Sequence, residues 1–223
     1  MEEYFPEYVD KVKVIYPGHY SEIQYTEDCC YDHADLKSMA NSPFFLFVGT
    51  IEKRKNVGMI IDAFFKLKEE SDEARDYKLV LAGRKGYGYE EFQEKVRGSN
   101  FSDDVIFTGF VTKEDCNRLY SHANAYVFPT VYEGFGSTQL ECMACHTPLI
   151  LSDIPTNREI SGEYGLFFDL DNLESLVGQM KEIVQGNYDH ERREKIADRV
   201  MGSFSWEKLA GRYIEQYKEV IGA

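Results

Sequence analysis

Short apolar runs alternate with amphipathic stretches along most of this chain, and this alternation restricts its fold more than any other feature. The apolar runs are Val12–Tyr16, Phe44–Val48, Lys78–Ala82, Val105–Thr108, Ala125–Phe128, Pro148–Leu151 and Leu166–Phe168. The segments between them repeat apolar residues at helical spacing, and Asn56 is placed to cap the helix predicted over Asn56–Lys68. The pattern predicts an α/β, doubly wound, mostly parallel sheet with helices on both faces.

The last quarter of the chain has a helical pattern without strands. We predict helices over Asn172–Gln185, His190–Met201 and Ser205–Ile221. Residues 1–223 are therefore interpreted as one domain, with an α/β core over 11–170 and a helical C-terminal tail over 171–223. The last helix has an apolar stripe that includes Trp206, Tyr213 and Tyr217. We expect part of this stripe to be exposed and to support a weak homodimer.

Charge and composition exclude several classes of protein. Lys and Arg total 25 against 39 for Asp and Glu, a formal charge of −14 that disfavours binding to nucleic acid. No apolar run approaches the length of a bilayer span, and the first residues lack the apolar region of a signal peptide. Five cysteines are too few for a disulfide scaffold. We expect a cytoplasmic location.

Two loops that follow predicted strands carry the features of an anion site. The first contains three consecutive cations, Lys53, Arg54 and Lys55, before a helix. The second contains Gly134 and Gly136, which allow backbone N–H groups to approach a ligand at the start of the next helix. Because ligands of open α/β sheets bind beyond the carboxyl ends of the strands, the two loops together suit a diphosphate. The alternative is a solvated basic turn with ordinary helix-end glycines, and spacing alone does not separate the two.

Two glutamates accompany the second loop. Glu133 lies in the loop and could contact a substrate hydroxyl, whereas Glu141 lies about one turn into the following helix and could accept hydrogen bonds from a ribose. The alternative for both is structural, as a charge near a helix N-terminus and a surface carboxylate.

Several segments, in the same order, resemble the family 4 retaining glycosyltransferases, which have the two-domain GT-B fold. The segment from Glu133 to Glu141 is similar to the Glu-x7-Glu motif of that family. The other matching segments are VKVIYPG (12–18), VGTIEKRKN (48–56), LVLAGRKG (79–86), VIFTGFV (105–111), PLILSDIPTNREI (148–160) and FSWEKLAGRYIEQY (204–217). The resemblance implies a Rossmann-like, nucleotide-sugar-binding half of a GT-B fold.

The resemblance also implies roles for individual residues. Arg54 and Lys55 would neutralise the donor diphosphate, and Glu141 would bind the ribose hydroxyls. The catalytic Glu133, with the backbone of Gly134, Phe135 and Gly136, would hold the sugar hydroxyls and a phosphate. The turn formed by Gly109, Phe110 and Val111 would contact the base. Such enzymes usually need no catalytic metal, and we expect none here. His146 replaces a usual glycine, and His tolerates a left-handed backbone better than most residues.

The implied function is donor binding for transfer of a hexose-type sugar, with retention, from a UDP- or GDP-sugar to a glycan or lipid-linked acceptor. The alternatives are a non-catalytic nucleotide-sugar-binding subunit and half of a sugar-nucleotide epimerase. We expect this chain to be inactive by itself, because the amino-terminal acceptor domain is absent and would come from elsewhere or from a partner chain. That domain could also place the protein at a membrane surface.

Two cysteine patterns suggest other chemistry. Cys142 to His146 reads Cys-x-x-Cys-His, the attachment pattern of c-type haem, but a buried helix explains it better within an α/β crossover. Cys29 and Cys30 have acidic and His neighbours, but adjacent cysteines chelate one metal ion poorly, so zinc is the weaker interpretation.

Overall fold

The structure, a computed structural model, describes residues 4–19, 22–39, 42–188 and 190–222. Within these ranges six parallel strands form one sheet in the order β3-β2-β1-β4-β5-β6. The strands are β1 (Phe44–Val48), β2 (Lys78–Ala82), β3 (Val105–Gly109), β4 (Ala125–Phe128), β5 (Leu149–Ser152) and β6 (Leu166–Phe168). The predicted doubly wound parallel sheet is confirmed.

Burial on both faces explains why the central strands read as unbroken apolar runs. Every residue of β4 and β5 is buried, as are the first four of β1 and the last four of β2. A parallel sheet has helices over both faces, so neither set of alternating side chains faces water. In register, Phe45 of β1 lies between Leu79 of β2 and Ala125 of β4.

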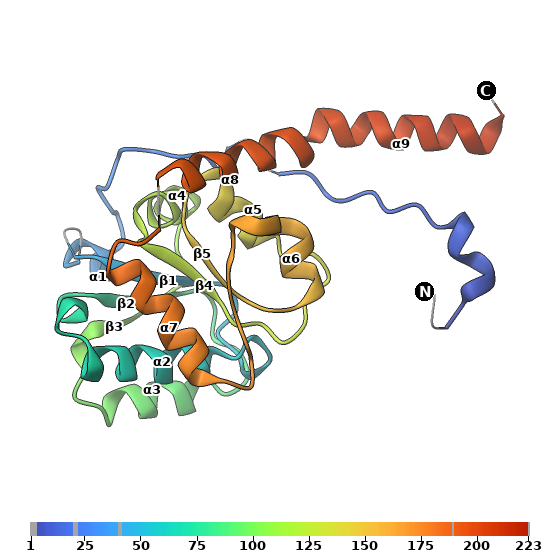
Figure 1. Cartoon of the computed structure of the whole chain (residues 1–223). Helices are drawn as coiled ribbons and strands as arrows, with labels where there is room; N and C mark the ends of the chain where they lie inside the picture. The colour runs from blue at the N-terminus through green and yellow to red at the C-terminus, as the bar shows by residue number, and fades with distance from the viewer. Residues whose placement is uncertain (1–3, 20–21, 40–41, 189, 223) are drawn as a thin grey trace.

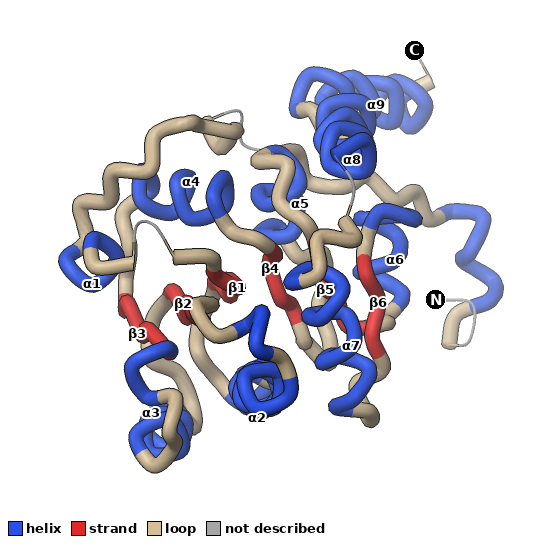
Figure 2. The backbone as a smooth tube through the Cα atoms, turned by 60° about the vertical axis from the view of Figure 1, so that its left-hand side comes forward, coloured by secondary structure: helices blue, strands red, loops and turns tan. Residues whose placement is uncertain are grey.

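Helices cover the sheet in two layers (Figures 1 and 2). One face carries α2 (Val57–Glu70), α3 (Tyr89–Arg97) and α7 (Leu173–Val184). The other carries α4 (Lys113–His122), α5 (Ser137–Ala144) and α6 (Pro155–Ser161), and α8 (His190–Ser203) packs on α5. The short α1 (Ala34–Lys37) lies beside β3. Two of the three helices expected in the tail are therefore α7 and α8, and the third is described below.

The prediction of a strand over Val12–Tyr16 is wrong. After a short 3₁₀ helix over Pro6–Lys11, residues 12–19 lie outside the sheet as non-regular chain. The exposed side chains of Val12 and Val14 have no sheet to cover, and Tyr16 packs on aromatic rings instead. Alternating apolar residues indicate a strand only where a neighbouring strand is available to pair with it.

Local signals at the helix ends had different outcomes. Thr112 caps α4 by accepting a hydrogen bond from the Asp115 N–H, as its residue type favours. Asn56 precedes α2 as expected, but its backbone is left-handed (φ 52°) and its side chain makes no capping bond. His146 also adopts a left-handed conformation, with φ 61°, which agrees with its expected place after a helix.

The final helix, α9 (Trp206–Ile221), extends away from the body of the protein, and residues 4–15 lie on the same side (Figure 1). Leu209 is buried near its start, whereas Trp206, Tyr213 and Tyr217 are 44%, 39% and 66% exposed. The expectation of an exposed apolar stripe on this helix is therefore confirmed. The weak homodimer remains a prediction.

Candidate functional site

The strand order places the two glycine-containing loops side by side. From β1 the chain adds β2 and β3 on one side of the sheet and then β4, β5 and β6 on the other, so the strand order reverses between β1 and β4. The loops that follow these two strands are Gly49–Asn56 and Pro129–Gly136. A crevice beyond the carboxyl ends of two such strands is where open α/β sheets bind ligands. The loops meet through Arg54, whose Nη1 donates to the Tyr132 carbonyl oxygen at 3.2 Å. Two segments nearly eighty residues apart thus form one site.

Two cations and one carboxylate converge in this crevice. Glu133 Oε1 lies 3.6 Å from Arg54 Nη1 and 3.9 Å from Lys55 Nζ. The Lys55 side chain is only 15% exposed, and its ammonium lies over the Phe128 ring, 5.6 Å from the centroid. Arg54 is more open, and Glu52 pairs with it at 2.9 Å. The 3₁₀ turn Lys53–Lys55 therefore presents two positive charges next to two carboxylates, Glu133 across the crevice and Glu52 beside Arg54.

Two glycines make room for the Lys55 ammonium and its loop. A Cβ at Gly49 would lie 2.8 Å from Lys55 Nζ. A Cβ at Gly83, after the neighbouring strand β2, would lie 1.9 Å from the Gly49 carbonyl oxygen. Both have φ of +146°, which side-chain-bearing residues rarely adopt. The steric need for glycine at these two positions became visible only in three dimensions.

A buried polar network holds the Glu133 loop, and sequence reasoning missed it. The Thr130 hydroxyl hydrogen is shared between the Tyr132 carbonyl oxygen (3.0 Å) and Glu133 Oε1 (3.3 Å). The Thr156 hydroxyl donates to the Glu133 carbonyl oxygen at 3.1 Å. Ser152 donates to the Thr130 carbonyl oxygen at 2.6 Å, and Asn157 Nδ2 donates to the Ser152 carbonyl oxygen at 2.9 Å. Polar residues of β5 and α6 therefore orient a loop that precedes them in sequence.

Gly134, Phe135 and Gly136 lead into α5. Gly136 is left-handed (φ +80°) and stands just before the helix, whose first N–H groups lack intrahelical partners. Phe135 is half-buried, and its ring stacks on Tyr16 with centroids 5.7 Å apart. Tyr16 lies in the segment predicted as a strand, so its contact with this loop was not anticipated. In the sequence, the one signal for this contact was that Tyr16 and Phe135 are both aromatic.

Glu141 faces a separate cavity of about 430 Å³ beside α4 and α5. The predicted base-contacting residues Phe110 and Val111 line the same cavity, and Gly109 adopts φ +67° immediately before them. Glu141 Oε2 accepts a hydrogen bond from the Tyr120 hydroxyl at 2.7 Å. Burial raises the pKa of the Glu141 carboxyl above its usual value, although this hydrogen bond acts in the opposite direction. The structure brings Glu141 and the Gly109–Val111 turn together, as a nucleoside site requires.

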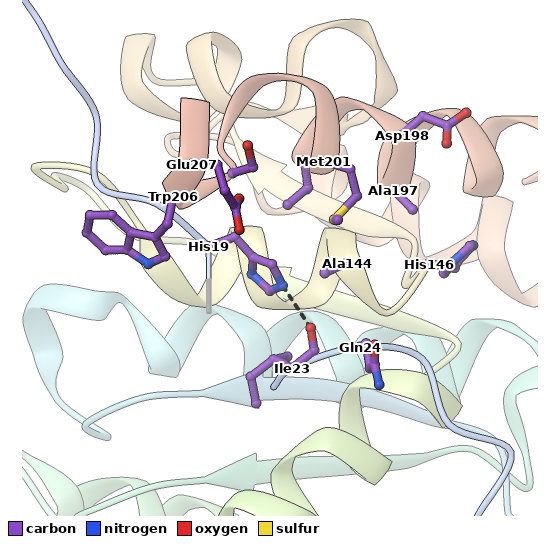
Figure 3. A pocket seen from close by; sticks show the side chains of 12 residues that line it. His19, Ile23, Gln24, Ala144, His146, Ala197, Asp198, Met201, Trp206 and Glu207 are labelled. Carbon is purple, nitrogen blue, oxygen red and sulfur yellow. Dashed lines mark hydrogen bonds between the residues drawn. The ribbon is translucent and has the colours of Figure 1, made fainter. Parts of the chain in front are cut away.

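Another cavity of about 360 Å³ lies where α8 meets α9, next to the entering chain (Figure 3). His19, Met201 and Trp206 are among its lining residues, and His19 Nε2 is 2.8 Å from the Ile23 carbonyl oxygen. None of the residues that the sequence singled out for donor binding lines this cavity. Ile23 lines both this cavity and the one beside Glu141, so the two share a wall.

The Cys-x-x-Cys-His pattern has a structural explanation. Cys142 and Cys145 lie buried in and just after α5, and burial raises the pKa of the Cys145 thiol to about 12. Cys29 and Cys30 are exposed. Over the described part of the chain, no group of three or more His, Cys, Asp or Glu side chains is arranged to hold a metal ion. A membrane-spanning helix is likewise missing from the residues that the structure places.

Comparison with known proteins decides the family. The sequence model of "Glycosyl transferases group 1" matches residues 32–200, which is most of the chain and includes both loops of the crevice. The chain belongs to this glycosyltransferase family. The resemblance seen in the motifs is thereby confirmed.

Relatives and solved structures agree with this assignment. An O-antigen chain mannosyltransferase of Escherichia coli is 30% identical, over 78% of this chain and 45% of that protein. An uncharacterized glycosyltransferase of Methanocaldococcus jannaschii is 28% identical, over 94% of this chain and 54% of that protein. A sucrose-phosphate synthase of Thermosynechococcus elongatus shares the fold with a TM-score of 0.81, 24% identity and coverage of 99% and 56%. The chain thus spans about half the length of the relatives it matches.

Proposed function

We propose that this chain is the nucleotide-sugar-binding half of a retaining glycosyltransferase. It would take a hexose-type sugar from a UDP- or GDP-sugar and transfer it to a glycan or lipid-linked acceptor. The observation that carries the proposal is the convergence of Arg54, Lys55 and Glu133 beyond β1 and β4, where the strand order reverses. Fixed positive charge and free backbone N–H groups are what hold a diphosphate; Arg54 and Lys55 would supply the first and the N-terminus of α5 the second.

Each part of the site has a place in this reaction. Glu141 would accept hydrogen bonds from the ribose, with Phe110 and Val111 beside the base. Arg54, Lys55 and the N-terminus of α5 would bind the diphosphate. During transfer, the bond between the anomeric carbon and a diphosphate oxygen breaks, so negative charge grows on the leaving group. Positive groups fixed beforehand stabilise that charge without reorganising, which lowers the barrier.

Glu133 would act on the sugar itself. Its carboxylate is oriented by Thr130 and by the two cations, so it is a fixed acceptor for sugar hydroxyls next to the diphosphate. The acceptor hydroxyl would approach from the opposite wall of the cleft, on the same face of the sugar as the leaving group. An acceptor domain or a partner chain would form that wall. We expect no metal to take part, because Arg54 and Lys55 would offset negative charge on the diphosphate.

Calorimetric titration tests the proposal directly. Wild-type protein is titrated with UDP and with GDP in the presence of EDTA, and we expect saturable binding of at least one. Lys55→Ala should weaken that binding about tenfold or more, because a charge-assisted contact to phosphate is typically worth about 1.5–3 kcal/mol. Lys95→Ala is the matched control, since Lys95 is a half-exposed cation near the end of α3 whose ammonium pairs with Asp62 of α2. No heat and no thermal shift with millimolar UDP or GDP would refute the proposal.

A further inference from the structure

Three aromatic rings join segments that lie far apart in sequence. The Tyr16 ring stacks on Phe135, with centroids 5.7 Å apart and planes inclined by 23°. The same ring lies 5.7 Å from Phe204, and Phe135 lies 6.0 Å from Phe204. These residues belong to the entering chain, to the Gly134–Gly136 loop and to the junction between α8 and α9. The loop is therefore packed against a chain segment outside the sheet.

The entering segment is itself held at several points. The Tyr16 hydroxyl donates a hydrogen bond to Glu159 Oε1 on α6. The His19 N–H donates to the Phe204 carbonyl oxygen at 2.7 Å. Gly18 lies so close to Trp206 that a Cβ there would be 2.5 Å from the indole ring. Tyr16 is thus presented to the loop by its own hydroxyl contact and by the residues that follow it, Gly18 and His19, which are fixed against the α8–α9 junction.

The loop has little packing of its own apart from Phe135. A Cβ at Gly134 would meet no atom within 4 Å, and the one at Gly136 would meet none closer than 3.5 Å. Glycines lose the most backbone freedom when a loop becomes ordered, so a loop with two of them needs a favourable contact to remain in one conformation. Phe135, between the two glycines, supplies that contact by packing against Tyr16 and Phe204.

We propose that Tyr16 is a positioning residue for the donor diphosphate. By stacking on Phe135, it holds the Gly134–Gly136 loop in the conformation that presents its backbone N–H groups and the N-terminus of α5. This inference rests on the proposed function, because the diphosphate is the ligand it concerns. Tyr16 makes no contact with the ligand and acts only through Phe135.

The test compares a nucleoside diphosphate with the corresponding monophosphate. Tyr16→Leu should weaken binding of the diphosphate about three- to tenfold, the range expected when an aromatic stack is lost, and leave the monophosphate nearly unchanged. Tyr16→Phe keeps the ring and should restore most of the difference. Tyr8→Leu is the matched control, because Tyr8 belongs to the same entering segment and is 47% exposed. A Tyr16→Leu protein with the wild-type affinity ratio would overturn the proposal.

Two measurements without a ligand complete the test. Amide hydrogen exchange should be faster at Gly134–Gly136 in Tyr16→Leu than in wild type, and unchanged in the middle of α2. The single Trp206, which covers Gly18, reports by its fluorescence whether the segment stays docked. Equal losses of both nucleotides together with a shifted Trp206 emission would show a merely structural role and overturn the proposal. A wild type that binds neither nucleotide refutes the proposed function, whereas hydrogen exchange still decides whether Tyr16 orders the loop.

Discussion

Removing the charge of Glu133 should strengthen binding of a free nucleoside diphosphate while weakening selection of the sugar. In the structure this carboxylate lies within 4 Å of both cations proposed to hold the diphosphate. It therefore repels the phosphates that those cations attract. Glu133→Gln keeps the size and the acceptor oxygen of the side chain but removes the repulsion.

The size of the effect follows from the geometry. A phosphate in contact with both cations would lie about 7 Å from the Glu133 carboxylate, where two unit charges interact by about 0.6 kcal/mol in water. A terminal phosphate carrying about two negative charges is then opposed by about 1 kcal/mol, or roughly fivefold in affinity. Screening at about 0.1 M salt reduces this, because the Debye length of about 10 Å is comparable to the separation. We therefore expect diphosphate binding to become about two- to fivefold tighter.

The assay is calorimetric titration of wild type and Glu133→Gln with the nucleoside diphosphate and with its sugar conjugate, at low and high salt. The gain for the diphosphate should shrink as salt rises, and the ratio of conjugate to diphosphate affinity should fall. Glu70→Gln is the matched control, since Glu70 ends α2 at the opposite edge of the sheet. Weaker diphosphate binding by Glu133→Gln at low salt would refute this account of the charges.

Two further predictions concern stability. Burial raises the pKa of the Glu141 carboxyl, so ionising it costs folding free energy once the pH exceeds 4.5, the pKa of this carboxyl in the unfolded chain. Glu141→Gln should therefore raise the melting temperature at pH 7 and have little effect at pH 4. Scanning fluorimetry at both pH values checks this, and an equal decrease at both would contradict it. Gly83→Ala would drive a Cβ against the Gly49 carbonyl and should destabilise the protein by about 2 kcal/mol or more. In Gly134→Ala the added Cβ meets no atom, so the free energy of unfolding should change by less than about 0.5 kcal/mol. Urea unfolding measures both.

Much of the fold was predictable because each buried strand carries its own signal. β1, β2, β4 and β6 were expected at the bounds observed, β3 is one residue longer than expected, and β5 is shifted by one residue. The caps Thr112, Asn172 and Ser205 accept backbone hydrogen bonds as their residue types favour. Such patterns depend on nearby residues alone. The cations of Lys53–Lys55 and the glycines of the second loop could likewise be selected from sequence, because loops after parallel strands meet at one edge of the sheet.

Other features depended on contacts that no local pattern encodes. The alternating residues of Val12–Tyr16 indicated a strand, but a strand forms only where the segment runs beside a sheet edge. These residues pair with neither edge strand, β3 or β6, and Tyr16 packs on Phe135 and Phe204 instead. The support of Glu133 by Thr130, Ser152 and Thr156 joins three separate segments, and the stack of Tyr16 on Phe135 joins two. Sequence determined which groups were available for the site. Tertiary packing decided which of them meet, because a side-chain contact depends on the relative placement of distant backbone segments and not on the residues beside it in the chain.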